Sequence, residues 1–178
     1  MMYAGEHLPD PVPLLTLRPG DIEMFRKLGI SQELLRAAGI KRVTDAEART
    51  EFGISGRPSQ DFSGIVFPYY AVETGDRSTA RLRRDNPELE NGEPKDKYVS
   101  AFGDRRRLYF SPGAKAKLDD AEISIVLVEA EKSALALTAF AERSSRKLLP
   151  IAMGGCWGWR GRIGRTNNAN GVRVEKTG

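Results

Sequence analysis

The stretch 124-SIVLVEAEKSALALTAF-140 decides the fold. Its residues 125–128 form a continuous apolar run, which predicts a strand buried on both faces. From Glu131 the apolar residues recur at helical spacing, and a second apolar run, 148-LLPIA-152, follows the helix. A strand, a helix and a strand in this order form a βαβ unit with parallel strands. We therefore expect a parallel α/β core to begin at residue 123 and to occupy residues 123–178 together with a basic tail.

Length and composition restrict the class of protein. The chain has 178 residues, enough for one domain with a small appendage, and 40% of them are hydrophobic and 29% charged. No apolar span approaches the roughly 20 residues that a membrane helix needs, and the N-terminus lacks the pattern of a signal peptide. One cysteine, Cys156, and one histidine, His7, exclude a disulfide framework and the usual Cys/His zinc site. These features predict a cytoplasmic protein.

The net charge of +4 is unevenly distributed along the chain. Residues 1–50 are balanced, residues 51–142 carry −3, and residues 143–178 carry +7, with eight Lys/Arg against one acid. A basic tail of this density favours an anionic partner such as nucleic acid. The alternative is a solvated end without such a partner.

Short helices are predicted between a Pro-rich, extended start (residues 1–19) and the first strands. In residues 20–56, Asp21 can cap a helix over 22–28, Ser31 can cap one over 32–38, and Thr44 with Glu47 forms a capping box for 45–52. Helices this short are marginal alone, so they must pack together or on the following domain. A three-helix unit of this kind either binds DNA or is simply a packing module.

Residues 57–122 predict a β-rich, basic subdomain. A hairpin is expected from runs at 65–70 and 78–84, with Pro68 indicating an edge strand or a bulge. Residues 85–96 have almost no apolar content and predict a mobile loop, followed by short strands within 97–101 and 107–110. The fold class is therefore mixed, α+β with a partial α/β core.

Several motifs, in this order, resemble the Toprim domain of bacterial-type primases, in the divergent form found in phage and plasmid replication proteins. They are 28-LGISQELLRAAGIKRVTDAEA-48, 64-GIVFPYY-70, 81-RLRR-84, 95-KDKYVSAFG-103, 107-RLYFSP-112, 126-VLVEAEKSALAL-137 and 151-IAMGGCWGWRG-161. The resemblance covers most of residues 28–161. It implies a small helical unit and a basic β-rich subdomain beside a partial Toprim-like βαβ parallel sheet.

The resemblance gives Glu129 a role. In Toprim proteins a glutamate at this place acts as general acid/base or helps to hold a divalent metal for phosphoryl transfer. The carboxyl edge of a parallel sheet is also where α/β proteins place ligands. Glu129 is thus the predicted catalytic residue, and Glu129 with Glu131 the predicted Mg²⁺ ligands. Alternatively, Glu129 is a helix-start acid stabilised by the helix dipole, and Glu131 is solvated.

Two departures from the family pattern limit this role. Ala130 stands where glycine is usual, and the Asp-x-Asp pair of the family is absent, because no aspartate follows Asp120. The resemblance therefore implies a chain that stops before the Toprim fold is complete. We expect Mg²⁺ binding to be weak or absent and this chain alone to be inactive. The parent protein would make primers by nucleotidyl transfer, with a downstream helicase domain as a further partner.

A basic surface is the predicted site of DNA binding. Strand alternation puts Arg81 and Arg83 on one face and Leu82 on the other, which suits the phosphates of a single strand or primer-template; the alternative is a sheet face kept soluble by charge. The run at 105–107 either meets an anion or is a solvated turn. Trp157 and Trp159 either form a stacking platform beside Arg160 or are packing residues. The candidate nucleic-acid contacts are Arg81, Arg83, Lys97, Arg105, Arg107, Lys132 and Arg160.

Three functions follow from these features. The first is a nucleic-acid-binding, primase-like domain of a mobile-element replication protein. The second is a non-catalytic nucleic-acid-binding or assembly module that keeps only the Toprim scaffold. The third is a nuclease of the same fold, since the first glutamate is shared between these activities.

Overall fold

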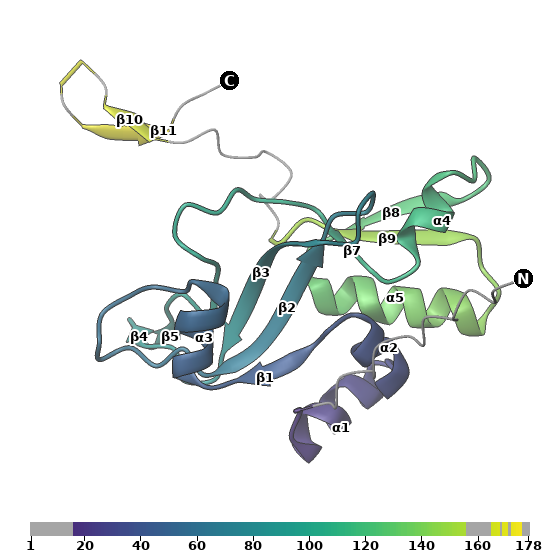
Figure 1. Ribbon diagram of the computed structural model, residues 1–178, viewed down its shortest axis with the longest axis horizontal. Helices are drawn as coiled ribbons and strands as arrows, with labels where there is room; N and C mark the ends of the chain where they lie inside the picture. Colours follow the sequence, from purple (N-terminus) through teal and green to yellow (C-terminus); the bar gives the residue numbers. More distant parts are fainter. Residues whose placement is uncertain (1–15, 156–164, 168, 171, 176–178) are drawn as a thin grey trace, which may run out of the picture.

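The computed structural model describes residues 16–155, 165–167, 169–170 and 172–175 (Figure 1). Helices and sheets are mixed, which confirms the predicted fold class. The helices are α1 (Pro19–Lys27), α2 (Gln32–Ala37), α3 (Asp45–Phe52), α4 (Ala114–Leu118) and α5 (Glu131–Arg143). The strands are β1 (Lys41–Val43), β2 (Gly64–Tyr70), β3 (Arg77–Arg84), β4 (Leu89–Glu90), β5 (Glu93–Pro94), β6 (Tyr98–Val99), β7 (Tyr109–Phe110), β8 (Ser124–Val128), β9 (Leu148–Ala152), β10 (Arg165–Asn167) and β11 (Arg173–Glu175).

The strands form two main sheets. An antiparallel sheet has the order β1-β2-β3-β6, and a mixed sheet has the order β7-β9-β8. Two hairpins, β4–β5 and β10–β11, stand apart from them (Figure 1). Within the described residues no helix is both long and apolar enough to cross a membrane.

Two of the three predicted N-terminal helix caps are confirmed. The Ser31 hydroxyl accepts a hydrogen bond from the Leu34 N–H at 3.1 Å, and Thr44 and Glu47 form a capping box at the start of α3. The third was wrong, because α1 begins before Asp21, at Pro19. Proline suits the first helical position because its fixed φ is helical and its missing N–H has no partner there.

The N-terminal helices do not form a unit of their own. Strand β1 lies between α2 and α3 and pairs with β2. Ile65 and Phe67 of β2 pack on one face of the sheet, with α1, α2 and α5, whereas Val66 packs on the other face with α3. The helices therefore pack on the following sheet, which is the second of the two arrangements that the sequence allowed (Figure 1).

The predicted β2–β3 hairpin is present, and the proline within it is accommodated. β2 is not an edge strand, since β1 and β3 flank it. However, β1 pairs only as far as Val66, so Pro68 has a neighbouring strand on one side only, and a bulge follows between Tyr69 and Tyr70. The proline thus lies where β2 is locally an edge, and the bulge follows it by one residue, so each of the two alternatives is met in part.

The segment 85–96 was predicted as a mobile loop, and this was wrong. It contains the hairpin β4–β5. Asn91 and Gly92 at its turn have φ values of 54° and 82°, the left-handed conformation that an Asn-Gly hairpin turn requires. The Asn-Gly pair was the signal in the sequence, and the low apolar content of the segment concealed it.

The βαβ unit is present, with β8 and β9 parallel and α5 between them in the chain. The prediction that β8 is buried on both faces was wrong. β8 is the edge strand of its sheet, and Ile125 and Leu127 on its outer face are 57% and 58% exposed. Helix α4 packs on this face over β9, where Ala114 contacts Leu149 and Ile151, but Ile125 and Leu127 of β8 belong to none of the hydrophobic clusters. Val128 on the inner face packs against the core.

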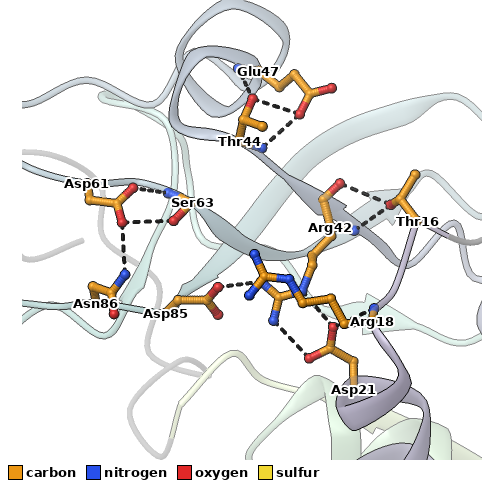
Figure 2. A network of polar contacts seen from close by, with 10 residues as sticks. All are labelled: Thr16, Arg18, Asp21, Arg42, Thr44, Glu47, Asp61, Ser63, Asp85 and Asn86. Carbon is orange, nitrogen blue, oxygen red and sulfur yellow. Dashed lines mark hydrogen bonds and ion pairs between the residues drawn. The ribbon is translucent and has the colours of Figure 1, made fainter.

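Arg42 joins three separate segments (Figure 2). Its Nε donates to Asp21 Oδ2 at 2.6 Å and its Nη2 to Asp21 Oδ1 at 2.9 Å, while Nη1 forms an ion pair with Asp85. Burial alone would raise the pKa of Asp21, but the hydrogen bonds from the Arg42 side chain and from the Arg18 N–H hold it below its usual value. The network thereby ties α1 to β1 and to the segment after β3.

Arg42→Met should destabilise the protein by about 2–4 kcal/mol at pH 7, because it leaves two partly buried aspartates without a cation. Urea unfolding measures the loss. Since folding lowers the pKa of Asp21, its contribution is complete above the unfolded value of 3.8 and disappears as the pH falls through the folded value. The difference between the variant and the wild type should therefore shrink below that pH.

Arg26→Met is the matched control, since Arg26 pairs with Glu23 on the exposed side of α1. It should cause no measurable change. Equal losses in the two variants would show that the Arg42 network does not hold these segments together.

Candidate nucleic-acid interface

Glu131, the first residue of α5, is buried, with 1% of its surface exposed. Its Oε1 accepts hydrogen bonds from the Tyr69 hydroxyl at 2.5 Å and from Arg81 Nη1 at 3.2 Å. The expectation that Glu131 is solvated was therefore wrong. Strand alternation explains the difference, because β2 and β3 turn Tyr69 and Arg81 toward the face that α5 covers.

The hydrogen bond from Tyr69 to Glu131 requires that the tyrosine keep its proton, and a glycine lies directly against the pair. Burial raises the pKa of Tyr69, and the negative charge of Glu131 raises it further, so the hydroxyl keeps its proton and donates it in the hydrogen bond. Gly154, after β9, has φ +66°, and a Cβ there would lie 3.2 Å from the Tyr69 hydroxyl and 3.3 Å from Arg81 Nη1. A glycine thus lets the chain close over the pair.

Arg81 and Arg83 lie on the same face of β3, as predicted. They stand opposite Phe67 and Ile65 of β2, whose side chains share that face. Two residues along a strand are about 7 Å apart, a distance that suits neighbouring phosphates. The Arg81 guanidinium also lies over the Tyr98 ring, 4.8 Å from its centroid.

The neighbouring Arg84 has a different role. It is buried on the opposite face, where Nη1 and Nη2 donate to Glu88 at 2.7 and 3.0 Å and the guanidinium stacks on Phe62. The hydrogen bonds from Arg84 lower the pKa of Glu88 to about 2. Arg84 therefore stabilises the sheet and is not available to a ligand.

Lys132 of α5 interacts electrostatically with Arg83 of β3 and with Lys97, which directly precedes β6. Burial lowers the pKa of Lys132, and the positive charges of Arg83 and Lys97 lower it further. In the described part of the chain no carboxylate forms an ion pair with any of the three. The structure thus gathers four predicted contact residues, Arg81 included, on one surface.

A cleft of about 280 Å³ lies beside this surface. Arg105 and Arg107, both predicted contacts, line it together with Arg106, and none of the three is ion-paired to another described residue. The full lining is Tyr69, Thr79, Arg81, Tyr98, Ser100, Asp104, Arg105, Arg106, Arg107, Met153 and Gly154. We call Arg81, Arg83, Lys97, Lys132 and Arg105, Arg106 and Arg107 the cationic face.

Glu129 lies where the sequence predicted, exposed and directly after the parallel strand β8. Its carbonyl accepts a hydrogen bond from the Gly155 N–H at 2.8 Å. Gly154, the preceding residue, lines the cleft. The backbone of Glu129 is thus hydrogen-bonded to the residue that follows the cleft-lining Gly154, at the carboxyl edge of the parallel strands.

The two predicted metal ligands differ in their surroundings. Glu131 is already bound by Tyr69 and Arg81, and a cation close to a carboxylate opposes metal binding there. Among the described residues no group of three or more Asp, Glu, His or Cys could hold a metal ion. Glu129 keeps its place as a predicted ligand, whereas the geometry does not favour Glu131 and does not form a shared Mg²⁺ site.

One predicted contact residue lies outside the described residues, and the structure adds site residues that the sequence did not predict. The residue outside is Arg160, and Trp157 and Trp159 lie there as well. The structure adds Arg106 to the candidate site and reveals the bond between Tyr69 and Glu131. Nothing in the sequence relates residues 62 positions apart, except that a tyrosine hydroxyl in a buried strand needs a partner.

Comparisons with known proteins relate this fold to primases. No protein-family model and no curated protein sequence matches the chain. A crystal structure of the Aquifex aeolicus primase, comprising its zinc-binding and RNA polymerase domains, is similar, with a TM-score of 0.51 and 18% identity over 76% of this chain and 36% of that chain. A structure of the DnaG catalytic core has a TM-score of 0.44 and 17% identity, over 74% and 46%.

This chain thus spans about a third of the length of the Aquifex primase chain and less than half of the length of the DnaG catalytic core. The first similarity establishes a primase-like fold.

Tyr69→Phe should lower the free energy of unfolding by about 1–3 kcal/mol, because it removes a donor from a buried carboxylate. Urea unfolding measures the loss. Tyr70→Phe is the matched control, since its hydroxyl makes no hydrogen bond with the described residues. A Tyr69→Phe variant as stable as this control would mean that Glu131 does not depend on the tyrosine.

Proposed function

We propose that this chain is a nucleic-acid-binding, primase-like domain that holds a single strand of DNA on the cationic face. The observation that carries the proposal is a concentration of positive charge without internal neutralisation. Of the cationic face, only Arg81 forms an ion pair with a described residue, Glu131. The other six cations repel one another, and a polyanion would relieve that repulsion.

The form of the surface supports a single strand as the ligand. Arg81 and Arg83 are two residues apart on one face of β3, a spacing that suits neighbouring phosphates, and Lys132 adds a further charged donor near Arg83. The Tyr98 ring and the Arg81 guanidinium that lies over it add a planar surface on which a base can stack. Binding to a single strand needs both features.

For a longer protein that contains this chain, we propose Mg²⁺-dependent nucleotidyl transfer that makes primers. Support comes from the primase-like fold and from the position of Glu129, which is exposed directly after the parallel strand β8, where the resemblance to Toprim domains expects a catalytic glutamate. In that role Glu129 is a metal ligand or general acid/base, and the remaining metal ligands come from outside the described residues. A phage or plasmid replication protein of the cytoplasm, with a helicase domain as partner, is the corresponding context.

A non-catalytic binding module is the second candidate. The lack of a carboxylate cluster among the described residues favours it. It shares the nucleic-acid binding of the first proposal and differs only in lacking the reaction. Primer synthesis by the protein that the full reading frame encodes separates the two candidates. Synthesis that is lost in Glu129→Gln supports the first candidate, and the absence of synthesis supports the second.

Arg83→Ala/Lys132→Ala should weaken binding to single-stranded DNA and reduce its salt dependence. Each phosphate contact contributes about 0.7 to the slope of log K against log salt concentration for a single strand, so losing two contacts should lower the slope by about 1.4. Fluorescence anisotropy of a labelled oligonucleotide over a salt series measures both quantities.

Arg146→Ala/Lys147→Ala removes the same charge just before β9, at the end of this strand opposite the cleft. It should leave the slope nearly unchanged. Equal slopes for the two double variants would remove the cationic face from the proposal.

Mg²⁺ should bind weakly to this chain, because Glu129 stands without a neighbouring free carboxylate among the described residues. NMR titration should show small, unsaturated shifts near Glu129 that are lost in Glu129→Gln. Tight binding would contradict this expectation and would mean that further ligands complete the site.

A further inference from the structure

Phe102 is the most exposed of the large hydrophobic residues in the described part of the chain, with 90% of its surface in water. It belongs to none of the hydrophobic clusters of the fold. Single exposed apolar residues are common and need no explanation by themselves. The position of Phe102 is what distinguishes it.

Phe102 stands at the tip of a tight turn that is fixed from both sides. The Asp104 N–H donates to the Ala101 carbonyl at 3.2 Å, and Gly103 has φ +86°, which closes a four-residue β-turn. Asp104 also accepts a hydrogen bond from the Thr79 hydroxyl, which ties the turn to β3. The ring is therefore presented to solvent by a defined turn.

The turn borders the cationic face. Ser100 and Asp104, two residues before and two after Phe102, both line the cleft. The arginine run begins directly after Asp104, and none of its three residues forms an ion pair with a described residue. An uncovered ring thus stands beside uncompensated cations, which is the pair of groups that a single strand needs, one for its bases and one for its phosphates.

We propose that Phe102 is a base-stacking residue for the strand bound on the cationic face. The ligand is a single-stranded nucleic acid with unpaired bases, because a base inside a duplex has no free face to offer. Stacking on a phenyl ring tolerates any base, so this contact adds affinity without sequence preference. This role rests on the nucleic-acid binding proposed above.

Two strands of equal length test the role, an oligo-dT strand and a strand of abasic sites with the same phosphates. Phe102→Ala should weaken binding of oligo-dT by between about 5- and 150-fold and leave binding of the abasic strand unchanged. Its salt slope should equal that of the wild type, since no phosphate contact is lost. Phe102→Trp should restore binding of oligo-dT, because an indole also stacks.

Leu89→Ala is the matched control, since Leu89 is 69% exposed on the separate hairpin β4–β5, and its binding should equal that of the wild type. If Phe102→Ala binds oligo-dT as the wild type does, or loses affinity for both strands equally, Phe102 does not stack on bases. These outcomes leave the proposed function intact. A wild-type protein that binds neither strand in a salt-dependent manner overturns the proposed function and this role together.

Discussion

The buried carboxylate of Glu131 is the constraint on which the rest of the structure depends. A carboxylate removed from water is costly unless hydrogen bonds and a cation compensate it. Tyr69 of β2 and Arg81 of β3 supply both, so α5 has to begin over this hairpin. Because α5 also joins β8 to β9, the same contact fixes the parallel strands relative to the antiparallel sheet.

The three arginines of β3 differ in how their charges are compensated. Arg84 is fully buried against Glu88, and Arg81 is partly exposed and shares its charge with Glu131. Arg83 lies between them in the sequence and has no acidic partner among the described residues. Like charges held together reduce stability, and such a local cost is expected where a binding site requires it. The cleft and the turn that carries Phe102 both adjoin this one charged surface.

Strong local patterns predicted much of the fold. The capping residues Ser31 and Thr44 marked their helices, and alternation placed Arg81 and Arg83 on one face. The strand β1 was missed because a three-residue strand has too few residues for a pattern and forms only by pairing with β2. The apolar run of β8 was mistaken for a strand buried on both faces because composition does not reveal which strand ends a sheet.

The sequence by itself determined the βαβ unit, the hairpin before it and the place of Glu129 after a parallel strand, because these depend on periodicity and on neighbours along the chain. Only the tertiary structure decided which charges are compensated. Glu131 follows Glu129 by two residues, yet one is buried against Tyr69 and Arg81 and the other is exposed. The reason is physical: solvation and ion pairing depend on residues that are distant in sequence and that only the packing of α5 on the sheet brings together.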